Sequence, residues 1–139
     1  MPDPIAPPAA SRPAETVELV SLAVSDGDLE AALAQYEAGA AFRPMARDPV
    51  GGAASVADTL IQLMDLRLPL CVHIRAIVPA DGIALVLSER NIVGTSPDGD
   101  RIQLCGTGAT VVRSGQEGSW HIVADAWNLD GPGSDRARG

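Results

Sequence analysis

The spacing of apolar residues along the chain changes once, from a helical period to an alternating one. Helical spacing over Ala14–Val24 predicts a first helix. The polar break Asp26-Gly27-Asp28 ends this helix, and its last aspartate can cap a second helix over Leu29–Glu37. A short strand over Ala40–Phe42 and a third helix over Ser55–Leu66 complete the helical half of the chain.

The rest of the chain has strand character, because it is rich in valine, isoleucine, leucine and threonine. The predicted strands are Leu70–Pro79, Ile83–Gly94, Arg101–Arg113 and Trp120–Leu129. Short connectors of glycine, proline and aspartate join them, too short to hold crossover helices, so the strands form an antiparallel meander. Helices first and strands later indicate an α+β fold, with the helices packed on one face of the sheet. Long twisted strands curl around such helices and enclose a cone whose mouth can admit a ligand.

Composition narrows the class of protein. Of the 139 residues, 46% are apolar and 20% are charged, which is enough for one packed core. The chain has ten basic and eighteen acidic residues, and the basic residues form no cluster, which argues against nucleic acid as a partner. All ten are arginines, so chemistry that depends on a lysine is excluded. No apolar run approaches the length of a membrane span, so no membrane partner is expected.

The ends of the chain differ in composition from the middle. Residues 1–13 alternate proline and alanine, and residues 131–139 are glycine, proline, serine and charge. We expect both to be disordered tails that flank a single domain over residues 14–130. The first residues lack the pattern of a secretion signal, and the two cysteines are compatible with a reducing compartment, so we expect a cytoplasmic protein.

Several short motifs, in this order, resemble those of a known superfamily. They are Ser25–Ala31, Tyr36-Glu37, Ala40–Phe42, Pro97-Asp98-Gly99 and Gly118–Val123. The chain resembles the cone-shaped proteins that include nuclear transport factor 2 (NTF2), ketosteroid isomerase and the SnoaL-like polyketide cyclases, whose fold is also called cystatin-like. Its nearest subgroup is a set of small bacterial proteins, some from enediyne antibiotic clusters. The resemblance implies fold more than function, because this fold hosts enzymes, carriers and assembly modules alike.

The catalytic residues of the isomerases are absent at the matching positions. Their tyrosine corresponds to Val20, their aspartate base to Pro44 and their oxyanion-hole aspartate to Thr110. The chain is therefore not expected to be a ketosteroid isomerase by the usual mechanism.

The resemblance also implies which residues line the pocket. On the last two strands, Gly106, Gly108 and Thr110 would face the cone together with Val123, Asp125 and Trp127. The full expected lining is Val20, Leu60, Met64, Glu89, Arg90, Gly106, Gly108, Thr110, Val123, Asp125 and Trp127. Strand alternation places Cys105, Thr107, Trp120 and Ile122 on the opposite face. The two glycines either leave room for a close approach or relieve a bend in a strongly curled sheet.

Asp125 is the candidate catalytic residue. It lies in an otherwise apolar strand with Trp127 two positions away, and a carboxyl group beside an indole and away from water suits acid–base work. The alternative is a structural aspartate that is hydrogen-bonded to a neighbouring strand or to Arg90. The subgroup's motif has asparagine and proline after this aspartate, where this chain has Ala126 and Trp127.

Glu89 and Arg90 are adjacent, so one of them faces the cone or its rim. An inward Arg90 would bind a ligand carboxylate or neutralise Asp125, whereas the interpretation we favour from sequence places both residues at a dimer surface. His73 and His121 lack ligand spacing, and no metal or cofactor is predicted. Tyr36 and Phe42 are expected in the core.

Three functions remain open at this point. The first is binding of an apolar small molecule, such as a polyketide or polyene; if the protein is also an enzyme, it would be a cofactor-free isomerase or cyclase that uses Asp125. The second is a non-catalytic homodimeric interaction module, with an interface on the outer sheet face that includes Cys105, Thr107 and Ile122. The third, a limonene-type epoxide hydrolase, requires Glu89 to face inward.

Overall fold

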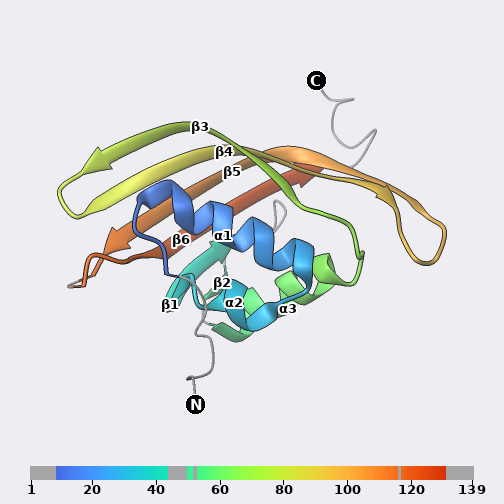
Figure 1. Ribbon diagram of the computed structural model, residues 1–139, viewed down its shortest axis with the longest axis horizontal. Coiled ribbons are helices and arrows are strands. Elements are labelled where there is room, and N and C mark those ends of the chain that lie inside the picture. The colour runs from blue at the N-terminus through green and yellow to red at the C-terminus, as the bar shows by residue number, and fades with distance from the viewer. Residues whose placement is uncertain (1–8, 44–49, 52, 116, 131–139) are drawn as a thin grey trace, which may run out of the picture.

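A curved six-stranded sheet and three helices make up the described part of this computed structural model, residues 9–43, 50–51, 53–115 and 117–130. The helices are α1 (Pro13–Asp26), α2 (Leu29–Leu33) and α3 (Ala53–Met64). The strands are β1 (Tyr36–Arg43), β2 (Val50–Gly51), β3 (Cys71–Ala80), β4 (Ile83–Thr95), β5 (Arg101–Ser114) and β6 (Trp120–Asp130). The predicted α+β class and all four long strands are confirmed (Figure 1).

The strands lie in the order β2-β1-β6-β5-β4-β3. Pairing from β3 to β6 is antiparallel throughout, which confirms the predicted meander. The sheet as a whole is nevertheless mixed, because β1 pairs with β6 in parallel. The predicted antiparallel sheet is therefore correct for β3–β6 but does not include this parallel pair, which joins the first strand of the chain to the last.

The step from α2 to β1 also differs from the sequence prediction. Asp28 caps α2 as expected, since its carboxylate accepts a hydrogen bond from the Ala31 backbone N–H at 3.1 Å. The helix ends at Leu33, however, and not at Glu37. The backbone N–H of Ile122 donates to the Gln35 carbonyl at 2.7 Å, so the chain joins the sheet at once and Tyr36 begins β1.

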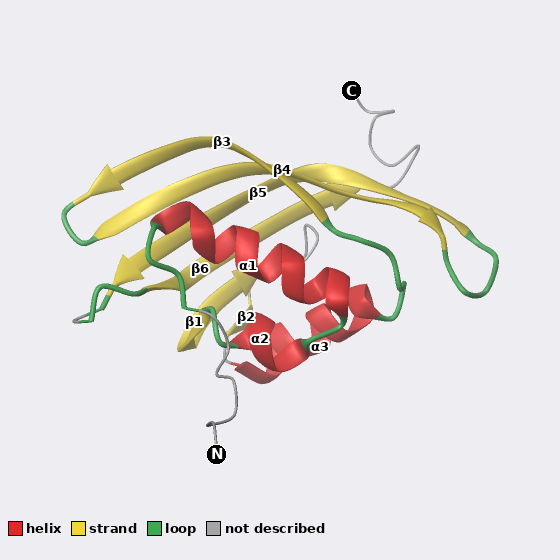
Figure 2. Cartoon of the chain, in the orientation of Figure 1, coloured by secondary structure: helices red, strands yellow, loops and turns green. Residues whose placement is uncertain are grey.

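The helices cover one face of the sheet, and the core lies between them (Figure 2). Val17, Val20 and Val24 of α1 are buried against inward side chains of the sheet such as Val86 and Val112. Leu60 and Leu63 of α3, together with Phe42 and Trp127, fill the space near β1 and β6. Tyr36 and Phe42 are both buried, as predicted.

A bulge reverses part of the predicted face assignment on β6. The pairing of β5 with β6 shifts register between Val111 and Val112, so that Ala124 lies opposite Val111 and Ile122 opposite Val112. One extra residue exchanges the two faces of a strand beyond it. Ile122, predicted on the outer face, is therefore buried at 1% exposure. Cys105 and Thr107 are exposed, as that prediction required.

One residue of the predicted N-terminal tail contacts the sheet. Ala10, which the sequence placed in a tail, is buried, and its carbonyl accepts a hydrogen bond from the Trp120 backbone N–H at 2.9 Å. Residues 1–8 and the predicted tail 131–139 lie outside the described residues. Within the described part, no helix is both long and apolar enough to cross a membrane.

Candidate functional site

Asp125 lies at the centre of a buried polar network on the inner face of the sheet. Its Oδ2 accepts hydrogen bonds from the Tyr36 hydroxyl and the Trp127 indole N–H, both at 2.8 Å. Its Oδ1 accepts from the Thr110 hydroxyl at 2.8 Å. These partners lie on β1, β6 and β5, and the Asp125 side chain is only 1% exposed. The carboxylate therefore ties together three neighbouring strands.

Arg90 extends the network to β4. Its Nη2 donates to the Thr110 hydroxyl oxygen at 2.9 Å and lies 3.5 Å from Asp125 Oδ1, while its Nε donates to Ser88 Oγ at 3.1 Å. The guanidinium carbon is 4.4 Å from the centre of the Trp127 ring, a cation–π contact. Arg90 is buried, so its predicted place at a dimer surface is wrong.

Gly108 provides the space that Arg90 occupies. A Cβ atom at residue 108 would overlap the Arg90 guanidinium, because that side chain crosses β5 at this point to reach β6. At Gly106, a Cβ atom would instead meet the backbone carbonyl of Asn128. Both glycines thus allow a close approach, which is one of the two interpretations left open by the sequence. The atoms that approach them belong to this chain and not to a ligand.

The electrostatics of the network follow from its burial. Asp125 accepts from three neutral donors and one guanidinium, which fills the acceptor capacity of a carboxylate. Burial raises the pKa of the Tyr36 hydroxyl well above its usual value, and the negative charge of Asp125 raises it further. Tyr36 is therefore held as a neutral donor. The acid–base role of Asp125 stays a prediction. Its contacts are those expected of the alternative, a structural aspartate that is hydrogen-bonded to neighbouring strands and to Arg90.

The other predicted pocket residues divide into three groups. Val20, Leu60, Gly108, Thr110 and Trp127 are buried on the inner side, and Met64, Gly106 and Val123 are half-buried. Glu89 faces the other way: its side chain is 53% exposed and lies 3.4 Å from Arg75. An epoxide hydrolase site built on an inward Glu89 is therefore not formed.

Sequence reasoning missed two members of the network, Tyr36 and Ser88. Tyr36 was assigned to a helix and to the core, with no polar partner. Ser88 lies two residues before Arg90 on the same face of β4, and that alternation was the available signal.

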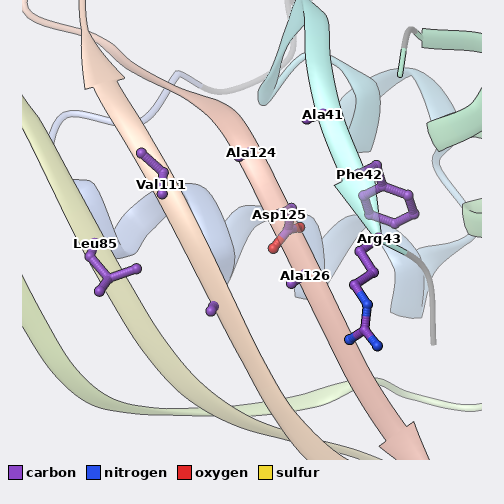
Figure 3. A pocket seen from close by; sticks show the side chains of 9 residues that line it. Ala41, Phe42, Arg43, Leu85, Val111, Ala124, Asp125 and Ala126 are labelled. Carbon is purple, nitrogen blue, oxygen red and sulfur yellow. The ribbon is translucent and has the colours of Figure 1, made fainter. Parts of the chain in front are cut away.

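The outer face of the sheet carries a shallow apolar groove of about 350 Å³. In Figure 3 the strands pass in front of α1, so the groove opens on the side away from that helix. The residues around it are Ala41, Phe42, Arg43, Leu85, Ala109, Val111, Ala124, Asp125 and Ala126. Small side chains at its centre give it its depth.

Cys71 and Cys105 are exposed and not paired with each other, and no cluster of three or more metal-ligating side chains occurs among the described residues.

This architecture, a strongly curved sheet wrapped on N-terminal helices with one buried ion pair inside, defines a cone-shaped α+β protein. No protein-family model and no curated protein matches the chain. Solved structures do match. A conserved protein from Planctomyces limnophilus has a TM-score of 0.75 at 17% identity, over 85% of this chain and 93% of that one.

Two further structures carry family names. A ketosteroid isomerase-like protein from Erwinia carotovora atroseptica has a TM-score of 0.72 at 16% identity, over 86% of this chain and 92% of that one. A candidate dehydratase of the NTF2-like family from Streptomyces avermitilis has a TM-score of 0.68 at 14% identity, covering 84% and 94%. The chain therefore has the NTF2-like, or cystatin-like, fold that its motifs indicated. The enediyne subgroup stays a prediction.

Proposed function

We propose that this protein binds an apolar small molecule of polyketide or polyene type between its helices and the inner face of its sheet. The observation that carries the proposal is the inner face itself, which is aliphatic and aromatic except for the buried polar network of Tyr36, Ser88, Arg90, Thr110 and Asp125. Such a surface binds ligands through burial and shape, with a few polar groups that fix orientation. The likeness to an isomerase-like protein and a candidate dehydratase supports a small-molecule site of this kind.

The contacts favour binding over acid–base catalysis. A general base needs an oxygen within reach of the substrate proton, and both Asp125 oxygens already accept two hydrogen bonds. We therefore propose that Asp125 holds Arg90 and Tyr36 in place. Isomerisation or cyclisation in secondary metabolism remains the catalytic alternative, and it requires Asp125 to lose one of these partners when substrate binds. We also propose a cytoplasmic location, because exposed thiols suit a reducing compartment.

A titration with diphenylhexatriene, a polyene that fluoresces in apolar surroundings, tests the binding proposal. We expect a saturable increase with one probe per chain. The control variant is Ala124→Arg, which fills the outer groove and leaves the inner face untouched. Saturable binding that survives this substitution supports the proposal. Binding that is absent, or that disappears in Ala124→Arg, contradicts it.

A second proposal concerns the outer face, where we infer a homodimer interface. The groove is apolar, and Leu87 and Val78 lie exposed on the neighbouring strands of the same face. An apolar sheet face of this kind is typical of surfaces that pair with a second copy. Cys105 and Thr107 lie on this face as predicted, whereas Ile122 is buried inside and cannot contribute. Such an interface is compatible with both proposed functions, the non-catalytic interaction module and the small-molecule-binding protein.

A further inference from the structure

The guanidinium of Arg90 is only partly used by the network that surrounds it. It has five N–H donors, and its hydrogen bonds to the described residues leave from Nε and Nη2. Among the described residues, no hydrogen bond leaves from Nη1, which carries two of the five donors. The side chain is 98% buried, so bulk water does not satisfy these donors either. A buried donor without an acceptor costs more than a typical hydrogen bond contributes, so an unpaired Nη1 needs an explanation.

The distances within the network show how loosely Arg90 is paired. The three 2.8 Å hydrogen bonds of Asp125 come from neutral groups, and Arg90 Nη2 is the most distant donor at 3.5 Å. The shorter hydrogen bonds of Arg90 go to the hydroxyl oxygens of Thr110 and Ser88. The guanidinium is thus positioned by Trp127, Gly108 and two hydroxyl groups as much as by the carboxylate.

Charge balance restricts what Nη1 can accept. Arg90 and Asp125 are the buried ionised residues of the described chain, and together they are neutral. A carboxylate ligand would add an uncompensated negative charge to an interior that excludes water, which is costly. A second cation would be repelled by the guanidinium. A neutral oxygen acceptor satisfies the N–H donors and leaves the charge balance unchanged.

From these observations we infer that Arg90 Nη1 is the polar anchor of the ligand site and binds a neutral carbonyl oxygen, such as that of a ketone or lactone, on an otherwise apolar molecule. This inference rests on the proposed function and specifies its ligand class. We infer that the acceptor lies on the helix side of the sheet, because the Arg90 side chain is buried on that side. Arg90 then orients the ligand, and Asp125 orients Arg90.

The test compares three probes of equal chain length: undecane, 2-undecanone and undecanoate. A hydrogen bond from a charged donor predicts that the ketone binds roughly 10- to 100-fold more tightly than the hydrocarbon. The carbonyl stretch of bound ¹³C-labelled ketone should lie at lower frequency than in hexane, a readout that needs no variant. Arg90→Lys keeps the positive charge but has no Nη1, so it should abolish the ketone's advantage. Arg75→Lys, on the outer face, is the matched control and should keep it.

The outcomes separate the inference from the function on which it rests. If neither undecane nor the ketone binds, the proposed apolar site itself is wrong. If both bind equally and the carbonyl stretch is unshifted, the site exists but a buried water alone satisfies Nη1, and the inference is overturned. Tighter binding of undecanoate would overturn the preference for a neutral acceptor. A shifted stretch in the wild-type protein supports the inference even if Arg90→Lys does not fold.

Discussion

Replacing Asp125 with asparagine tests whether this residue is a structural centre or an available acid. The substitution keeps the shape of the side chain but exchanges one acceptor oxygen for an NH₂ donor. On one side that NH₂ group would face Trp127 Nε1–H, and on the other it would face Arg90 Nη2. Both partners can only donate, so neither orientation of the amide satisfies the site.

The expected magnitude follows from this geometry. An unsatisfied buried polar group costs about 1–3 kcal/mol, and removal of one partner of a buried ion pair costs about 3–5 kcal/mol. The two costs describe the same contacts and are not additive, so we expect a loss of about 3–5 kcal/mol in unfolding free energy. Against a typical total of about 5–15 kcal/mol, such a loss is easily measured.

Urea unfolding at pH 7, followed by tryptophan fluorescence at one fixed protein concentration, measures this change. The midpoint should fall while the slope with denaturant stays constant. Glu89→Gln is the matched control, since it makes the same chemical exchange on the outer face beside Arg90 and should change stability by less than about 0.5 kcal/mol. An Asp125→Asn protein as stable as the wild type, or more stable, would refute the structural role and restore Asp125 as a candidate acid.

Three further expectations follow from the same structure. Gly108→Ala should cost about 1–3 kcal/mol by urea unfolding, because its Cβ overlaps the Arg90 guanidinium, whereas Gly39→Ala meets no atom within 4 Å and should lack this steric cost. Tyr36 is the chain's one tyrosine and its pKa is raised, so the folded protein should show no tyrosinate absorbance at 295 nm near pH 10. The contribution of Tyr36 to the unfolding free energy should be fully present below pH 10 and should fall above it by up to about 1.4 kcal/mol per pH unit. Titration of Tyr36 at its usual pH in the folded protein would contradict this. The wild-type protein should sediment as a dimer at micromolar concentration and Ala124→Arg as a monomer, and a monomeric wild type would overturn the interface.

The sequence predicts the elements of this fold well where periodicity is local. The long strands and their turns follow from alternation and from the glycine, proline and aspartate of their connectors. The start of β1 was missed because Tyr36 and Glu37 continue an alanine-rich helical pattern. What places them in the sheet is a backbone hydrogen bond from Ile122 to Gln35, and the helical pattern contains no sign of it.

The site was predictable in part, and for a similar reason. Alternation showed that Glu89 and Arg90 point to opposite faces, but one strand alone cannot show which face is the inner one. The neighbouring strand contains the missing signal: Ser88 pairs with Gly108, and Gly108 leaves the room that the Arg90 side chain occupies. The bulge that turns Ile122 inward has no comparable signal, since it depends on the register between two strands.

The parallel pairing of β1 with β6 has a consequence for how the chain folds. β6 lies between β1 and β5, so the sheet has a gap in its middle until the last described strand arrives. Tyr36 and Asp125, which meet there, are 89 residues apart in sequence. Closing so long a loop is entropically slow, and a nascent chain that lacks β6 exposes two unpaired strand edges during synthesis. The helices and the β3–β5 meander are local and can form early, whereas the Asp125 network can form only at the end. Completion of the sheet, and with it of the Asp125 network, therefore depends on the arrival of β6.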